Sequence, residues 1–393
     1  MRDVLVVGGG PIGSYVAFRL AGMGYGVAVL EKKERLGGKV CCVGIISLEC
    51  LSTFNIDDSV VLKRVNSARI FSPSGRLIRL WRGEEQACII DRAAFDLSMT
   101  EMAIDAGAEY HFSSLVRGIT AKDDRVVAEV AQNGTGLEFE ARMVVIASGF
   151  GSRLPDVLGL GKAGDCVVGA QAEVTTANVD EIEVYLGRKV APGFFGWLVP
   201  TTSETALVGL LSRHRADFYM KKLIVSLTKK GKVISDEVEP GYRGITLSPP
   251  KRTYGKRVIV VGDAAGQVKP TTGGGIYFGL LSAEIAAKHL KQALEDDDLS
   301  PGRLAGYERE WKKKLGQELK ICYWARRFYE KLSDKKIDQI FDIIKANDID
   351  EVLLKADSLS FDWHGRAIIK LARQKAMSRF FNIIRLPSWI GAE

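Results

Sequence analysis

Three glycines near the N-terminus have a spacing that is suited to phosphate binding. Gly8, Gly10 and Gly13 follow the apolar run 4–7 and open a helical pattern that continues to Leu20. Gly8 permits a tight turn, Gly10 lets the backbone approach a pyrophosphate, and Gly13 lets the helix pack close to the strand. The start of such a helix also attracts phosphate oxygens. The spacing therefore predicts a phosphate-binding turn between a strand and a helix.

A carboxylate stands where a ribose would bind. The next apolar run, 26–30, ends in Glu31, which lies 23 residues after Gly8. That separation is close to the roughly 20 residues expected for the acid that binds the ribose hydroxyls of a dinucleotide. The alternative is a tight turn without a ligand. Strand, glycine turn, helix and acid together favour an adenine dinucleotide.

A second glycine-rich segment decides between NAD and FAD. The buried-strand run 258–261 leads into Asp263, and the triplet 273–275 then opens a helix at Ile276. A carboxylate at a strand end can accept hydrogen bonds from a ribityl hydroxyl. Backbone N–H groups at the helix start can reach phosphate or the flavin ring. A glycine pair at 37–38 also follows the ribose acid, as in flavoproteins. These features favour FAD.

With these motifs in place, the sequence resembles the geranylgeranyl reductase family of FAD enzymes, within the para-hydroxybenzoate-hydroxylase-like fold group. The resemblance runs almost from end to end. The loop 41–45 (CCVGI) resembles one that passes close to the isoalloxazine in that family, and 195–200 (FGWLVP) resembles its aromatic-x-Trp-x-Phe-Pro signature, with valine where phenylalanine is usual. Residues 262–276 resemble the third FAD motif, and Tyr307 and Trp311 match helices that open the C-terminal region.

The resemblance implies a fold and a domain organisation. We expect an α/β fold with α+β elements: a Rossmann-like FAD-binding domain, an interleaved antiparallel-sheet substrate domain and a helical C-terminal region. The expected FAD domain takes residues 1–75, 85–165 and 255–300, the substrate sheet takes 76–84 and 166–254, and the helical region takes 301–393.

The resemblance also implies site residues. The expected FAD-binding residues are Gly8, Gly10, Pro11, Ile12, Gly13, Glu31, Lys32, Cys41, Cys42, Gly44, Arg92, Val116, Gly149, Asp263, Gly274, Gly275 and Ile276. The expected substrate-channel residues are Phe195, Trp197 and Pro200, whereas Phe194 is interpreted as sheet core. Cys41 is a candidate catalytic acid. Its alternative role is only to shape the flavin pocket, since a free buried cysteine is more often inert.

Members of this family saturate isolated C=C bonds of geranylgeranyl chains. An isolated alkene is a poor hydride acceptor, so the site needs a hydride donor, an acid and a dry channel. We therefore expect an FAD-dependent reductase of geranylgeranyl chains on a membrane lipid precursor of the archaeal ether-lipid type. No second glycine motif follows a strand, which leaves the electron donor open between a ferredoxin, a reduced deazaflavin and NAD(P)H.

Three alternative functions remain at the level of the sequence. The first is reduction of another prenyl chain, on a chlorophyll precursor or a quinone. The second is a flavin monooxygenase; these usually carry a histidine shortly after the Gly-Asp-Ala stretch, where this chain has Gly266. The third is a non-catalytic prenyl carrier, against which the retained glycine motifs, Glu31 and Asp263 argue.

The positive charge concentrates at the C-terminal end. Residues 301–393 hold 19 Lys/Arg and 13 Asp/Glu, which gives +6 of the net +7. Between Trp363 and Ala392 no acid occurs, and basic residues alternate with apolar and aromatic ones. Such a helix can lie in a membrane interface and attract anionic lipids; the alternative is a helix packed on the core with its basic face in water. We expect a cytoplasmic protein, peripheral at the inner face of the cell membrane, with a prenylated lipid partner and no nucleic-acid partner.

Composition excludes several other classes. No run reaches the roughly 18 uncharged apolar residues of a membrane span. The six cysteines are scattered and fit neither a disulfide framework nor a zinc site, so a reducing cytosol is expected. The four histidines lie at no metal-ligand spacing, and we expect no metal.

Overall fold

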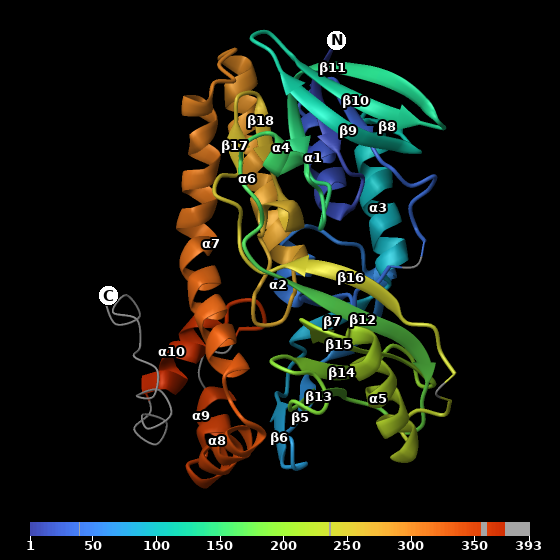
Figure 1. Cartoon of the computed structure of the whole chain (residues 1–393), viewed down its shortest axis with the longest axis vertical. Helices are drawn as coiled ribbons and strands as arrows, with labels where there is room; N and C mark the ends of the chain where they lie inside the picture. The colour runs from blue at the N-terminus through green and yellow to red at the C-terminus, as the bar shows by residue number, and fades with distance from the viewer. Residues whose placement is uncertain (39, 236, 355–359, 374–393) are drawn as a thin grey trace. The chain divides into compact units, whose positions relative to one another are not determined.

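The computed structural model describes residues 1–38, 40–235, 237–354 and 360–373 (Figure 1). The chain divides into two compact units, each assembled from three separate stretches. Unit 1 comprises Met1–Val40, Arg92–Cys166 and Gly244–Leu319, and unit 2 comprises Cys41–Asp91, Val167–Arg243 and the chain from Lys320 onward.

This division differs from the domain boundaries expected from the sequence. Residues 41–75 and 85–91, expected in the FAD domain, belong to unit 2, whereas residues 166 and 244–254, expected in the substrate sheet, and residues 301–319, expected in the helical region, belong to unit 1. Strand pairing explains the first difference: β5 (Ser67–Phe71) pairs in parallel with β13 (Ile182–Leu186), more than 100 residues further along the chain. Hydrogen bonds between strands so far apart in sequence leave no periodic signal.

Unit 1 is built on an eight-stranded mixed sheet with the path β17-β18-β11-β1-β2-β8, to which β10 and β9 are joined through β11. The central strand β1 pairs in parallel with β2 and with the end of β11, and its residues 4–7 are buried, as predicted for this run. The strands are β1 (Arg2–Val7), β2 (Val27–Leu30), β8 (Glu109–His111), β9 (Ser114–Ala121), β10 (Val126–Gln132), β11 (Thr135–Ile146), β17 (Tyr254–Gly255) and β18 (Val258–Val260).

Helices of unit 1 hold the glycine motifs in place. Helix α1 contacts β1 and β2 on one side and α3 and α6 on the others (Figure 1). Its first residue is Pro11, whose fixed φ suits the first helical position. The helical segments are α1 (Pro11–Ala21), α3 (Arg92–Asp105), α4 (Leu154–Val157), the 3-10 turn η2 (Gly262–Ala265), α6 (Ile276–Glu295) and the first part of α7 (Pro301–Glu330).

Unit 2 contains a seven-stranded sheet with the order β16-β12-β15-β14-β13-β5-β6 and a three-stranded sheet with the order β3-β7-β4. The strands not yet given are β3 (Ile45–Ser47), β4 (Val61–Val65), β6 (Leu77–Trp81), β7 (Ala87–Ile90), β12 (Cys166–Thr175), β14 (Phe195–Pro200), β15 (Thr205–Ser212) and β16 (Gly241–Thr246). The helical segments are α2 (Leu48–Thr53), η1 (Asp58–Val60), α5 (Ala216–Lys229), α8 (Asp334–Ala346), α9 (Ile349–Leu354) and α10 (Gly365–Arg373).

Helix α5 was not expected within the substrate sheet. It packs on β15, and its Leu223 lies so close to Gly196 of β14 that a Cβ there would be 2.9 Å from the leucine Cδ2. The helix therefore covers one face of the seven-stranded sheet. Among the helices of the described residues, none is both long and apolar enough to cross a membrane.

Candidate active site

The glycine turn of unit 1 is fixed by close backbone packing. Gly8 has φ +106°, and a Cβ there would lie 2.6 Å from the carbonyl oxygen of Ala147. At Gly13 a Cβ would lie 1.9 Å from the carbonyl oxygen of Gly8. Both positions exclude any side chain because the backbone itself is in the way. These two glycines are needed by the fold, with or without a ligand.

Gly10 differs from these two glycines, because a side chain there would meet nothing. Its backbone is extended (φ −69°, ψ 175°), and a Cβ would have no atom of the described chain within 4 Å. Helix α1 starts at the next residue and, as far as the chain is described, receives no side-chain cap. Open space over the backbone and an uncapped helix start are what a pyrophosphate requires. The turn thus fits the dinucleotide part of FAD.

Glu31 is held rigidly beside this turn. Its carboxylate accepts hydrogen bonds from the Gly9 N–H at 2.7 Å and from the Lys33 N–H at 2.9 Å. The side chain is 6% exposed, whereas that of Lys32 points into solvent. Each carboxylate oxygen keeps a lone pair after these bonds, so the group can also accept from ribose hydroxyls. The predicted role of Glu31 is compatible with this geometry.

The second glycine segment lies against the first. Ile12 of α1 packs between Gly262 and Gly279, where a Cβ at Gly279 would lie 2.6 Å from the isoleucine Cδ1. At Gly275, which precedes α6, a Cβ would lie 2.8 Å from Oδ1 of Asp263. The absence of side chains therefore brings the starts of α1 and α6 together and sets the Asp263 carboxylate beside the α6 start.

A buried polar network that sequence reasoning missed supports the Asp263 turn. Gln267 accepts from the Gly262 N–H at 2.8 Å and donates to the Tyr307 hydroxyl at 2.8 Å, and that hydroxyl donates to the Val260 carbonyl at 2.9 Å. Gln267 and Tyr307 are fully buried. Tyr307 entered the sequence analysis only through the family resemblance. Gln267 gave no signal, because an isolated glutamine in a loop has no pattern.

The other expected FAD residues of unit 1 lie around the same sheet. Arg92 starts α3 and forms a buried ion pair with Asp96 at 2.6 Å. Gly149 has φ +71° and follows β11. The side chain of Val116 is 9% exposed and belongs to the hydrophobic core, so only its backbone is suited to contact a ligand.

In unit 2, the cysteine loop is anchored to the edge of the seven-stranded sheet. The Cys41 thiol donates to the Gly241 carbonyl at 3.4 Å, and the Gln171 side-chain amide donates to the Cys42 carbonyl at 3.2 Å. Gly44 has φ +72°. Burial, followed by the neighbouring Cys42, raises the pKa of Cys41 to about 11, against an opposing effect of Arg243. Cys41 is therefore a protonated thiol at neutral pH.

The aromatic signature occupies β14. Phe195 and Trp197 share one face, with ring centroids 6.0 Å apart, whereas alternation along the strand puts Pro200 on the other face. The three predicted channel residues therefore cannot line one surface together. Phe194 is fully buried, with the Arg326 guanidinium 3.5 Å from its ring centroid, which confirms its interpretation as a core residue.

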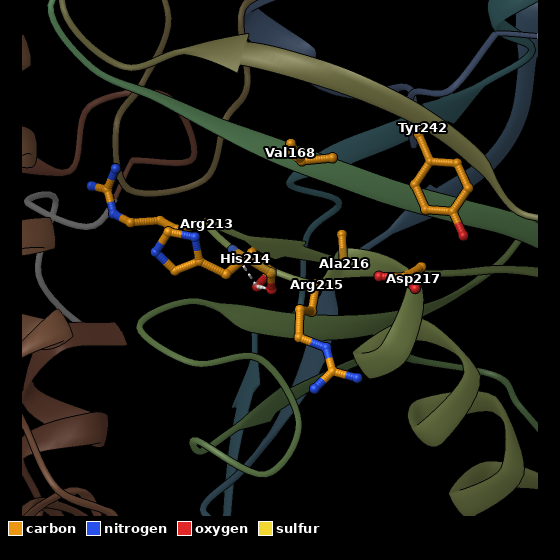
Figure 2. Close-up of a pocket in the computed structure, with 8 residues that line it drawn as sticks. Val168, Arg213, His214, Arg215, Ala216, Asp217 and Tyr242 are labelled. Atoms are coloured by element: carbon orange, nitrogen blue, oxygen red, sulfur yellow. Dashed lines mark hydrogen bonds between the residues drawn. The ribbon is translucent and has the colours of Figure 1, made fainter.

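Unit 2 also has a shallow hollow of about 370 Å³ beside the start of α5 (Figure 2). It is lined by Val168, Tyr242 and residues 212–217. Of the FAD and substrate residues expected from the sequence, all of which lie in the described part of the chain, none lines this hollow. Of its charged groups, Arg213 pairs with Glu330 at 2.7 Å and the Arg215 guanidinium lies 4.4 Å from the ring centroid of Phe218. Burial raises the pKa of Tyr242, and the negative charge of Asp217 raises it further. We assign it no role in the chemistry.

Comparison with known proteins agrees with this geometry. Residues 3–343 match the family model described as lycopene cyclase protein. A digeranylgeranylglycerophospholipid reductase of Methanocaldococcus jannaschii is 31% identical over 90% of this chain and 93% of its own, and a protein of the same name with the number 2, from Methanopyrus kandleri, is 28% identical over 96% of both chains. A solved geranylgeranyl bacteriochlorophyll reductase-like protein from Thermoplasma acidophilum is 28% identical, with a TM-score of 0.84 over 98% of this chain and 99% of its own.

More distant solved structures share the fold alone. The flavin-dependent halogenase CmlS is 17% identical with a TM-score of 0.67, and covers 98% of this chain and 78% of its own. The fold and the dinucleotide cradle define an FAD-dependent oxidoreductase of the para-hydroxybenzoate-hydroxylase-like group. Within that group, the chain belongs to the geranylgeranyl reductase family, and it also matches the lycopene cyclase model over residues 3–343.

Proposed function

We propose that this protein is an FAD-dependent reductase that saturates C=C bonds of geranylgeranyl chains on a membrane lipid precursor of the archaeal ether-lipid type. The observation that carries the proposal is the end-to-end similarity to relatives named digeranylgeranylglycerophospholipid reductase. The intact cradle at Gly10, Glu31 and Gly275 supports an enzyme over a non-catalytic carrier, because a carrier has no need of a cofactor site.

Residues of unit 1 would bind the cofactor. FAD, when bound, supplies the hydride. The α1 start and Gly10 would bind its pyrophosphate, Glu31 its adenosine ribose, and Asp263 its ribityl chain. Gly10 directly precedes α1, Glu31 directly follows β2 and Asp263 lies in η2, so packed elements hold these groups and they would orient the cofactor without further ordering.

Cys41 and Trp197 have the task of handling the alkene. Trp197 is 8% exposed and packs beside Phe195, and the two rings form the apolar part of β14 that would contact an isoprenoid chain. The Cys41 thiol carries a proton at every physiological pH, but a thiol with a pKa of about 11 is a weak acid. We infer that the Cys41 sulfur would donate the proton that one carbon of the double bond receives, while FAD, when bound, would supply the hydride for the other carbon; a separate protonation by so weak an acid would be too unfavourable.

The test of this proposal is an anaerobic single turnover. Enzyme reduced with dithionite, freed of excess reductant and mixed with a digeranylgeranylglycerophospholipid, should regain the absorbance of oxidised flavin at a rate that depends on lipid concentration. Trp197→Ala should slow this reaction more than it weakens FAD binding, by about a hundredfold if the alkene is mispositioned. Reoxidation that requires oxygen would instead indicate a monooxygenase. The same mixture with a prenylated quinone or a geranylgeranylated chlorophyll precursor tests the other prenyl substrates.

We also propose that the protein works at a membrane surface. In the described part of α10, Arg366 and Arg373 are exposed, while Ala367 and Ala372 are buried, the latter in an apolar cluster with Phe341. The helix thus exposes its two arginines to solvent, while its buried alanines hold it against the rest of unit 2. The remainder of the expected basic helix, 374–393, lies outside the described residues.

Vesicle sedimentation tests the membrane proposal. Reversal of both arginines, Arg366→Glu with Arg373→Glu, should weaken binding to vesicles with anionic lipid by at least about 2 kcal/mol, or roughly thirtyfold, since each basic group contributes about 1 kcal/mol. Lys162→Glu with Lys122→Glu, at two exposed side chains of unit 1, reverses the same number of charges, is the matched control and should sediment like the wild type. Equal sedimentation of all three proteins would show that α10 is purely structural.

A further inference from the structure

One face of the seven-stranded sheet carries a buried donor and a buried acceptor that have no hydrogen-bond partner in the structure and are not bonded to each other. Gln171 on β12 lies directly opposite Gly209 on β15, which in turn lies opposite Trp197 on β14. Gln171 and Trp197 are each 8% exposed. Trp197 Nε1 and Gln171 Oε1 are both buried without a hydrogen-bond partner. A buried polar atom left unpaired is costly, so the pair calls for an explanation.

The indole reaches over the strand between them. A Cβ at Gly209 would lie 2.4 Å from Cζ2 and 2.6 Å from Cε2 of Trp197, so the ring occupies the space that a side chain of β15 would fill. Nε1 is bonded to Cε2 and therefore lies above β15 as well. Neighbouring strands are about 4.8 Å apart, which leaves the N–H one strand away from Gln171, within the span of a glutamine side chain.

The amide nitrogen of Gln171 already has a hydrogen-bond partner. Its Nε2 donates to the Cys42 carbonyl at 3.2 Å, and a carbonyl can only accept, which fixes the orientation of the amide. Oε1 is consequently the acceptor that is left over, and an indole N–H can only donate. The two unsatisfied atoms are chemically complementary and both are shielded from water.

We propose that Trp197 Nε1–H donates a hydrogen bond to Gln171 Oε1 in the working protein, and that Gln171 is a positioning residue joining the aromatic signature to the cysteine loop. Gln171 then fixes the indole plane through one end of its amide and the Cys42 carbonyl through the other. Since Cys41 precedes Cys42, this link also holds the thiol toward the Gly241 carbonyl. The consequence for turnover rests on the reductase function proposed above, whereas the hydrogen bond itself does not.

Three variants separate the two ends of the link. Gln171→Met keeps the length of the side chain and removes both polar ends. Gln171→Glu keeps the acceptor for Trp197 but, as a carboxylate, loses the donor for Cys42. Trp197→Phe removes only the indole donor. Trp81→Phe, at a tryptophan of β6 that is 54% exposed, is the matched control. Thermal melting of each FAD-loaded variant shows whether it is folded.

The first readout is the indole N–H resonance of the FAD-loaded protein labelled with 15N-tryptophan, assigned by its loss in Trp197→Phe. In the wild type it should lie downfield, as for a hydrogen-bonded N–H, and show no cross-relaxation with water. Gln171→Met should shift it upfield, Gln171→Glu should leave it downfield, and Trp81→Phe should leave it unchanged. An upfield wild-type resonance, one contacting water, or one indifferent to Gln171→Met would overturn the proposal.

The second readout is alkylation of Cys41 by iodoacetamide at fixed pH, followed by mass spectrometry. Gln171→Met and Gln171→Glu should raise the rate about fivefold, the factor that corresponds to loss of one neutral hydrogen bond. Trp81→Phe should not change it. Equal rates in all the proteins would refute the link to the loop. In lipid reduction, Gln171→Met should lower kcat more than it raises KM or weakens FAD binding. Protein that shows the resonance and alkylation effects but reduces no prenyl lipid would refute the proposed function and leave this inference standing.

Discussion

Gly10→Ala separates the cofactor site from the fold. At this position the backbone already has φ −69° and ψ 175°, which alanine adopts freely, and the new methyl group would meet no described atom within 4 Å. Only a bound ligand would meet it. The variant should therefore fold normally and bind FAD poorly.

Both magnitudes follow from the geometry. A glycine-to-alanine change at a compatible backbone stabilises a protein by about 0.4–1 kcal/mol, because the unfolded chain loses freedom. A pyrophosphate pushed away from the α1 start loses at least one charge-assisted hydrogen bond, worth about 1.5–3 kcal/mol. The apoprotein should be as stable as the wild type or slightly more so, while the Kd for FAD should rise by roughly 10- to 150-fold.

The assay is a titration of FAD fluorescence with stripped apoprotein, accompanied by thermal melting of the apo forms. Gly13→Ala is the matched control: its Cβ would lie 1.9 Å from the Gly8 carbonyl oxygen, so this apoprotein should be severely destabilised. Wild-type FAD affinity in Gly10→Ala would contradict this prediction, because it would mean that no ligand approaches this turn. An unfolded apo form of Gly10→Ala would contradict it as well, because the fold itself would then need the glycine.

Three further predictions concern single side chains. Glu31→Ala should raise the Kd for FAD by the same 10- to 150-fold, because the ribose loses its hydrogen-bond acceptor. It should also lower the melting temperature of the apoprotein, because the N–H groups of Gly9 and Lys33 are left unpaired. Unchanged affinity in the fluorescence titration would show that Glu31 is misassigned. The rate of Cys41 alkylation should increase with pH to a midpoint near 11, since only the thiolate reacts, and at pH 8 it should be about a hundredfold slower than for a thiol of pKa 9. Mass spectrometry measures the rate, and Cys41→Ser assigns the modified residue. A midpoint at pH 9 would refute the buried thiol. Tyr307→Phe should destabilise the protein by about 1–3 kcal/mol and weaken FAD binding, because it leaves Gln267 without its acceptor. Denaturant unfolding measures the loss of stability. Tyr242→Phe, at a half-exposed tyrosine, is the control and should show no such loss.

The dinucleotide turn was largely predictable from the sequence, because its physics is local. The run 4–7, the three glycines and Glu31 lie within one strand–helix–strand stretch, so their spacing alone encodes the turn. The observed helix, Pro11–Ala21, extends one residue beyond the predicted end at Leu20. The second glycine segment was readable for the same reason.

The unit boundaries and the supporting side chains were not predictable. Residues 41–75 join unit 2 because β5 pairs with β13, a partner far away in sequence. Gln171 and Gln267 act through atoms contributed by distant elements, and neither residue stands in a recognisable pattern. Such contacts depend on strand register and loop packing, which hydrophobic periodicity does not specify.

The mass of the lipid product shows directly whether this protein is a geranylgeranyl lipid reductase. Reduced enzyme incubated without oxygen with a digeranylgeranylglycerophospholipid should yield a lipid heavier by about two mass units for each double bond saturated, since one hydride and one proton are added. The same reaction in deuterium oxide should leave at least one deuterium for each bond reduced, because the proton comes from an exchangeable group such as the Cys41 thiol. A product of unchanged mass would indicate rearrangement or cyclisation, and a gain of one oxygen atom on admission of air would indicate a monooxygenase. Either result would contradict the assignment of this protein as a geranylgeranyl lipid reductase.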